Sequence, residues 1–226
     1  MRIEPLGDAA WLIRIADEFH PATSLDAVLR GLHQLEAAAI PGIAELAPAY
    51  TTIGVFLDQR RIDDLDKLEE QIRDALRGST TSAPSASPRT LEVPVCYEGD
   101  FAPDLGDVAK HAGLSPDEVV RRHSTAVYRV SCVGFTPGFP YFSGLPSELA
   151  TPRRASPRKE IPAGSVAIGG TQAGIYPRRS PGGWNIIGRT PLRLFNVEQN
   201  PPALFQAGDG VRFRRISRDE FEAMAR

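Results

Sequence analysis

Apolar positions in the first third of the chain follow helical spacing in some segments and form strand-like runs in others. Apolar residues recur at helical spacing over 25–35 and again over 65–76. Strand-like apolar runs lie at 9–15, 42–47 and 51–57. The order of strand, helix, two strands and helix predicts a small α+β domain over residues 1–78, with both helices on one face of a sheet.

Residues 79–89 break this pattern. They begin with STTSAPSASP, a small, polar, proline-containing run with the composition of an interdomain linker. We therefore expect two domains, residues 1–78 and 90–226, joined by 79–89.

The second domain has short strand-like runs and few helices. Its predicted strands lie at 91–97, 127–133, 165–168, 186–187, 192–197, 204–205 and 210–216. Predicted helices cover 104–112, 116–123 and 219–226, the second of them opened by a capping box from Ser115 to Glu118. Many short strands joined by Gly/Pro turns indicate a mainly-β domain that closes into a barrel.

Residues 134–189 hold ten of the chain's 20 glycines, mixed with prolines and aromatic residues. This composition predicts ordered loops with exposed backbone N–H groups, although a loop-rich β core explains it as well. Backbone N–H groups at Gly169 and Gly170, or at Gly182 and Gly183, would suit an anion. We expect a groove lined by Phe135, Pro137, Gly138, Phe139, Tyr141, Gln172, Tyr176 and Trp184.

Charge is spread unevenly along a chain of net charge −2. Residues 1–77 carry 14 acidic and 8 basic side chains, whereas residues 129–193 carry 2 acidic and 9 basic ones. The second stretch offers a positive surface for a phosphate or a carboxylate. The slightly acidic whole and the lack of a known motif argue against nucleic-acid binding.

Composition also removes several classes of protein. No apolar run reaches the ~18–20 residues of a membrane span, and the first residues lack a signal peptide's features, so we expect a cytoplasmic protein. Cys96 and Cys132 lie in apolar contexts and are expected to be buried free thiols. Four histidines without paired spacing predict no metal site.

Three polar residues are the candidate catalytic groups: His123, Gln172 and Arg189. Gln172 stands among small residues and could read an amide or a carboxylate, or else stabilise a turn. His123 is the best general base by residue type, with a core histidine as the alternative. Arg189 would add a charge-assisted contact, as would Arg153, Arg158, Arg178 and Arg179. There is no serine triad pattern and no Walker A loop.

Four long segments resemble one family. They are DLGDVAKHAGLSPDEVVRRHSTAVYRV, GFTPGFPYFSGLP, PRRASPRKEIPAGSVAIGGTQAGIYP and SPGGWNIIGRTPLRLF, and the match extends over residues 93–213. The family is that of the KipI-like proteins, also known as the B subunits of 5-oxoprolinase (PxpB), allophanate hydrolase subunit 1, or carboxyltransferase subdomains C and D. The resemblance implies a cyclophilin-like β-barrel in the second domain, and it does not imply prolyl isomerase activity.

The resemblance also implies an activity and partners. Members act with a KipA-like C subunit and an A subunit as an ATP-dependent 5-oxoprolinase, which opens the cyclic amide 5-oxoproline to glutamate. Alternatives are a KipI-type inhibitor of a histidine kinase and a carboxyltransferase or allophanate hydrolase component of urea metabolism. We expect ATP to serve the complex and the isolated chain to be inactive.

Overall fold

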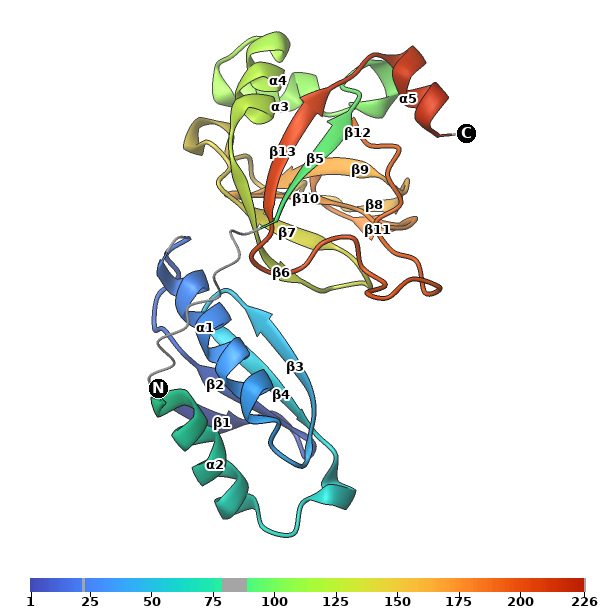
Figure 1. Ribbon diagram of the computed structural model, residues 1–226. Helices are drawn as coiled ribbons and strands as arrows, with labels where there is room; N and C mark the ends of the chain where they lie inside the picture. Colours follow the sequence, from blue (N-terminus) through green and yellow to red (C-terminus); the bar gives the residue numbers. More distant parts are fainter. Residues whose placement is uncertain (22, 79–88, 226) are drawn as a thin grey trace. The chain divides into compact units, whose positions relative to one another are not determined.

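The computed structural model describes residues 1–21, 23–78 and 89–225. The chain divides into two compact units, Met1–Ser87 and Pro88–Arg226 (Figure 1). The division falls within the predicted linker 79–89, but residues 79–88 lie outside the described residues. The linker therefore stays a prediction, and each unit is described by itself.

The first unit is a four-stranded antiparallel sheet with two helices. Its elements are β1 (Arg2–Pro5), β2 (Ala10–Arg14), α1 (Thr23–Ala38), β3 (Ile43–Ala49), β4 (Thr52–Leu57), a 3-10 turn (Gln59–Arg61) and α2 (Leu65–Arg77). The strand order is β1-β2-β4-β3. Val28 of α1 and Ile72 of α2 share one core with Ile13 and Ile53, so both helices pack on the same sheet face, as predicted.

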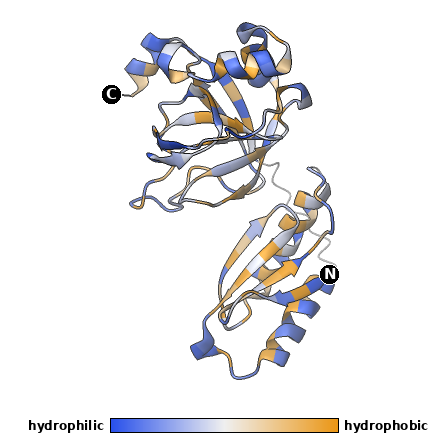
Figure 2. Ribbon diagram, turned by 180° about the vertical axis from the view of Figure 1, so that it is seen from behind, coloured by the Kyte–Doolittle hydropathy of each residue, from blue (hydrophilic) through white to orange (hydrophobic). Residues whose placement is uncertain are grey.

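Strand β1 was not predicted from the sequence. Its four residues, RIEP, contain only one aliphatic side chain that packs on the core, Ile3, and they end at a proline. An edge strand of this kind has no alternating apolar pattern to reveal it. In Figure 2, hydrophobic residues concentrate on the strands of this unit, while α2 is mostly hydrophilic with an apolar stripe.

The second unit is a closed seven-stranded barrel with helices on its outside. Its strands are β5 (Thr90–Val95), β6 (Tyr128–Val133), β7 (Pro140–Ser143), β8 (Arg158–Ile161), β9 (Ser165–Gly169), β10 (Gln172–Ile175), β11 (Ser180–Gly182), β12 (Asn185–Arg189) and β13 (Gly210–Arg215). Its helices are α3 (Leu105–Ala112), α4 (Pro116–Thr125) and α5 (Arg218–Met224), with 3-10 turns at Gly99–Phe101 and Ser147–Leu149. The barrel strands follow the order β12-β9-β10-β7-β6-β13-β5, and β8 pairs separately with β11.

A short seam joins the two ends of this strand order. Cys96, just after β5, exchanges two backbone hydrogen bonds of 2.9 Å with Arg189 of β12. Gly188 lies against this seam, where an added Cβ atom would stand 2.6 Å from Val95 Cγ1. A glycine is therefore needed for β5 and β12 to approach closely enough to close the barrel. The predicted mainly-β barrel is confirmed.

Two predicted strands are wrong. Residues 192–197 and 204–205 form irregular chain with one isolated bridge, between Phe195 and Ala203. Leu194 and Phe205 are buried in the barrel core, so the apolar pattern reflects burial of a loop and not strand pairing. Conversely, β7, β8, β10 and β11 were not predicted. β7, β10 and β11 each contain a glycine or proline that resembles a turn, and β8 is a short, mostly charged run, RKEI.

No helix among the described residues is long and apolar enough to cross a membrane.

Candidate functional site

The aromatic residues expected to line a groove do come together, in what we call the aromatic cluster: Phe135, Phe139, Tyr141, Tyr176 and Trp184. Phe139 stands at its centre, with ring centroids 4.8 Å from Tyr141, 5.2 Å from Tyr176 and 5.7 Å from both Phe135 and Trp184. Most of these contacts are edge-to-face, the geometry that aromatic quadrupoles favour.

The cluster is a packed core and not a lined groove. Phe139, Tyr176 and Trp184 are buried, with Ile161 and Ile186 packed among them. Burial raises the pKa of Tyr176, so its hydroxyl stays protonated at neutral pH. Tyr141 is half-buried, and Phe135 projects into solvent at 71% exposure. The prediction that these three buried rings line an open groove is therefore wrong.

The glycines beside the cluster are used for packing. An added Cβ atom on Gly169 would lie 2.5 Å from the Trp184 indole, so only glycine lets the ring lie against β9. Gly170 donates its N–H to the Thr151 carbonyl at 2.8 Å, which leaves that N–H unable to bind an anion. This bond argues against an anion at Gly170, and an anion site at Gly169 stays a prediction.

The second glycine pair, Gly182 and Gly183, also lies in close contact with neighbouring residues. A side chain at Gly182 would overlap the Tyr176 hydroxyl, and the Gly183 carbonyl accepts a 2.8 Å hydrogen bond from the Arg154 N–H. This pair therefore joins β11 to the arginine-containing segment that precedes β8. An anion site at Gly182 and Gly183 stays a prediction.

Gln172 begins β10 directly opposite Gly169 of β9 and is half-buried. Paired residues of antiparallel strands share a face of the sheet, so Gln172 lies on the face that Trp184 covers. This position puts an amide at the margin of the aromatic cluster. Its role in reading a substrate stays a prediction.

His123 lies at the end of α4 and is fully buried. Its Nδ1 lies 2.9 Å from the Tyr97 hydroxyl, and its ring packs on Tyr128 and Phe213. Burial lowers its pKa from 6.5 to about 3, which keeps the imidazole neutral at pH 7. A general base must reach its substrate, so this placement favours the core-histidine alternative.

Arg189 lies in different surroundings from Gln172 and His123. Its Nε donates to the Ala163 carbonyl at 2.9 Å, and its guanidinium stands 5.8 Å from the Phe101 ring and 5.9 Å from the Phe221 ring. It thus braces the barrel seam against α5. The structure does not bring His123, Gln172 and Arg189 together.

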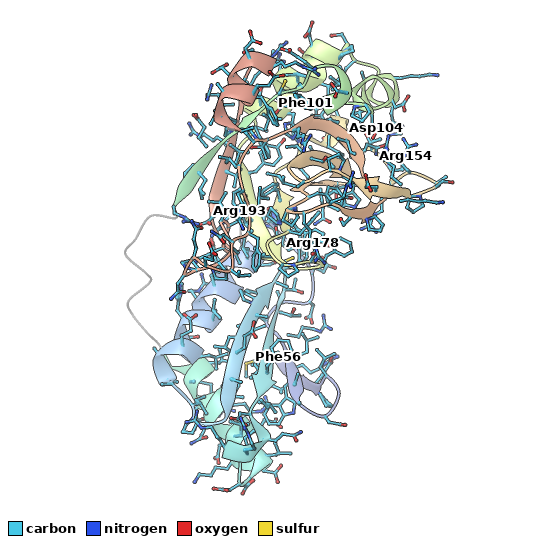
Figure 3. All side chains as sticks on the ribbon, turned by 90° about the vertical axis from the view of Figure 1, so that its right-hand side faces the viewer. Phe56, Phe101, Asp104, Arg154, Arg178 and Arg193 are labelled. Carbon is cyan, nitrogen blue, oxygen red and sulfur yellow. The ribbon has the colours of Figure 1, made fainter. Side chains whose placement is uncertain are left out.

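A buried ion cluster was not predicted from the sequence. Asp104, just before α3, is 1% exposed, and its carboxylate accepts two hydrogen bonds from Arg158, at 2.7 and 2.8 Å, and one of 2.9 Å from Arg154. The Ile186 N–H adds another at 2.7 Å. Figure 3 shows Asp104 and Arg154 side by side. The cluster fixes the start of α3 against β8 and β12, and its two guanidinium groups outnumber the single carboxylate.

The loop between β6 and β7, residues 134–139, is the exposed part of the aromatic motif. The Phe139 N–H donates to the Thr136 carbonyl at 3.0 Å, with Pro137 and Gly138 at the two central positions and a φ of 80° at Gly138. This is the pattern of a type II turn. A cavity of about 350 Å³ lies against the loop, lined by residues 133–138.

Similarity to known proteins agrees with the fold. The model of the carboxyltransferase domain, subdomain C and D, matches residues 1–205. The B subunit of 5-oxoprolinase from Bacillus subtilis is 40% identical over 231 residues, which cover 98% of this chain and 95% of that protein.

Two solved structures are similar along nearly the whole chain. TTHA0988 superposes with a TM-score of 0.78 at 33% sequence identity. The superposition covers 92% of this chain but only 40% of the TTHA0988 chain. PH0987 from Pyrococcus horikoshii matches with a TM-score of 0.58 at 39% identity, over 97% of this chain and 100% of that one. The chain therefore belongs to the carboxyltransferase domain family, subdomain C and D.

Proposed function

We propose that this chain is one component of an ATP-dependent 5-oxoprolinase, which hydrolyses the cyclic amide of 5-oxoproline to give glutamate. The observation that carries the proposal is the match to the 5-oxoprolinase B subunit of Bacillus subtilis, which extends over nearly the full length of both chains. A KipA-like C subunit and an A subunit are the partners.

The reaction requires several groups that the described residues of this chain do not bring together in one site. Amide nitrogen is a poor leaving group, so opening the ring at neutral pH requires activation, which phosphorylation of the amide oxygen by ATP would provide. The developing anion then needs hydrogen-bond donors or cations. Within the described residues, His123 is buried, Arg189 braces the barrel and the Gly170 N–H is engaged. This distribution supports a chain that completes an active site with its partners.

Reconstitution tests the proposal. The purified chain is assayed for ATP-dependent conversion of 5-oxoproline to glutamate alone, with each candidate partner, and with both. We expect turnover only when all the subunits are present. Failure of the complete mixture, with each chain folded, would refute the proposed function, and comparable turnover by the single chain would refute the need for partners.

The kinase-inhibitor and urea-pathway alternatives stay predictions. The same purified chain can be tested for inhibition of histidine-kinase autophosphorylation, and the reconstituted mixture for carboxylation of urea. Either activity, in a mixture that does not hydrolyse 5-oxoproline, would replace the proposed function.

A further inference from the structure

The β6–β7 loop (residues 134–139) is held rigidly by its own backbone. Besides the turn that Thr136 and Phe139 close, the Gly134 N–H donates to the Phe139 carbonyl at 3.0 Å. Gly138 packs beneath the chain at Phe195, where an added Cβ atom would stand 2.8 Å from Phe195 Cβ. The loop is therefore pre-organised, and whatever it binds meets a fixed shape.

Phe135 is strained and exposed at once. Its φ of 68° lies in the left-handed region, which is a genuine outlier for a bulky aromatic residue. Such strain persists where the surrounding structure imposes it, and it gathers at functional sites. Its ring makes one edge contact, 5.7 Å from Phe139, and remains 71% exposed. Within the described residues, nothing buries the side chain that this strained backbone presents.

Thr136 gives a second, independent observation at the same place. The residue is 7% exposed and lines the cavity of about 350 Å³, yet its Oγ1 has no hydrogen-bond partner among the described residues. Buried hydroxyls nearly always have a partner. The exposed ring of Phe135 therefore stands beside an open cavity whose lining includes a buried hydroxyl without a partner among the described residues.

The length of a related chain indicates what covers this surface. The same fold forms 40% of the longer chain of TTHA0988, so in that relative further polypeptide accompanies it. A cavity made by six consecutive residues lies open to solvent, which suits a protein surface better than an enclosed small molecule.

We propose that the β6–β7 loop is the anchor by which this chain docks onto the partner subunit of its complex. Phe135 enters an apolar pocket on that subunit. Exposed aromatic anchors of this kind dominate the binding energy of protein interfaces. The proposal rests on the proposed function, since it requires a partner subunit.

The test measures the dissociation constant between the purified chain and the candidate KipA-like protein by calorimetry. We expect Phe135→Ala to weaken binding by about 30-fold or more, as for an interface hot spot. Phe135→Gly should weaken it as much while the melting temperature holds or rises, because glycine relieves the strain at a positive φ.

Val127→Ala is the matched control. Val127 is 64% exposed and precedes β6, whereas Phe135 follows it, so the two side chains lie at opposite ends of one strand. We expect its affinity to equal that of the parent chain.

Other occupants give other results. Unchanged partner affinity in Phe135→Ala and Phe135→Gly, with the parent binding normally, would overturn the docking proposal and leave the proposed function standing. Loss of a self-association measured by light scattering, without loss of partner binding, would assign the loop to a second copy of this chain. Loss of 5-oxoproline binding alone would assign it to substrate. A parent chain that binds no candidate partner would overturn the proposed function together with the docking.

Discussion

His123 makes the second unit sensitive to acid. Burial lowers its pKa from 6.5 to about 3. Between these two values His123 is protonated in the unfolded chain but stays neutral in the folded chain. His123 therefore does not lower the free energy of unfolding above pH 6.5. As the pH falls from 6.5 towards 3, it lowers the free energy of unfolding progressively. Each pH unit within that window costs about 1.4 kcal/mol.

The loss between pH 7 and pH 5 is about 2 kcal/mol. Because pH 5 lies well above the folded value, the unfolded pKa sets this magnitude. The phenols that surround the ring, Tyr97 and Tyr128, both have raised pKa values, chiefly through burial, and stay neutral throughout the range. A total stability of ~5–15 kcal/mol makes such a loss easy to measure.

The assay uses the position of the chain's two tryptophans. Trp11 lies in the first unit and Trp184 in the buried aromatic cluster of the second, so a Trp11→Phe background makes fluorescence report on the second unit alone. Urea unfolding is followed at pH 7 and pH 5. His123→Asn, which does not titrate and keeps an acceptor for the Tyr97 hydroxyl, is the control. An equal loss of stability in the parent and in His123→Asn would refute the reasoning.

Three further changes have distinct expected outcomes. Asp104→Asn leaves two guanidinium groups without their counter-charge and should lower the free energy of unfolding by about 2–4 kcal/mol, measured by urea unfolding. Asp107→Asn, on the exposed surface of α3, is the control and should change the free energy of unfolding little. Gly188→Ala should destabilise the barrel seam by about 1–3 kcal/mol, while Gly106→Ala in α3, which has open space for a side chain, should hold or raise the melting temperature. Gln172→Ala should reduce turnover of the reconstituted complex by the equivalent of about 1–3 kcal/mol without lowering the melting temperature; normal activity with a lowered melting point would make Gln172 structural.

Local rules predicted most of the helices and the class of both units. The Ser115 hydroxyl caps α4 at the Glu118 N–H as predicted, although the Glu118 carboxylate binds Arg121 and Arg122 and does not complete the predicted capping box. The helical periods of the first unit place both helices correctly. Strands rich in glycine and proline were missed, because pairing across the sheet decides them and local preference does not. The irregular chain around Phe205 was mistaken for strand because burial alone makes a loop apolar.

The candidate site was less predictable because its residues are related only in space. Asp104 meets Arg154 and Arg158 across 50 and 54 positions of sequence, and no spacing rule connects them. His123 stands next to a strand that enters the glycine-rich loops, and its full burial depends on Phe213, 90 residues later. Residue type alone suggested that His123 is a general base, whereas its burial in the core favours a structural role.

The composition of the aromatic motif has two physical causes that the sequence does not separate. Gly169 and Gly174 are small because Trp184 and Phe139 pack directly on their backbones, a demand that holds whether or not a ligand binds. Phe135 cannot be explained in this way, since its ring is exposed and its backbone conformation disfavours any bulky side chain. The backbone conformation alone would favour a glycine there, and the ring gains only one edge contact, with Phe139, within this chain. The proposed docking onto a partner subunit would account for the aromatic side chain.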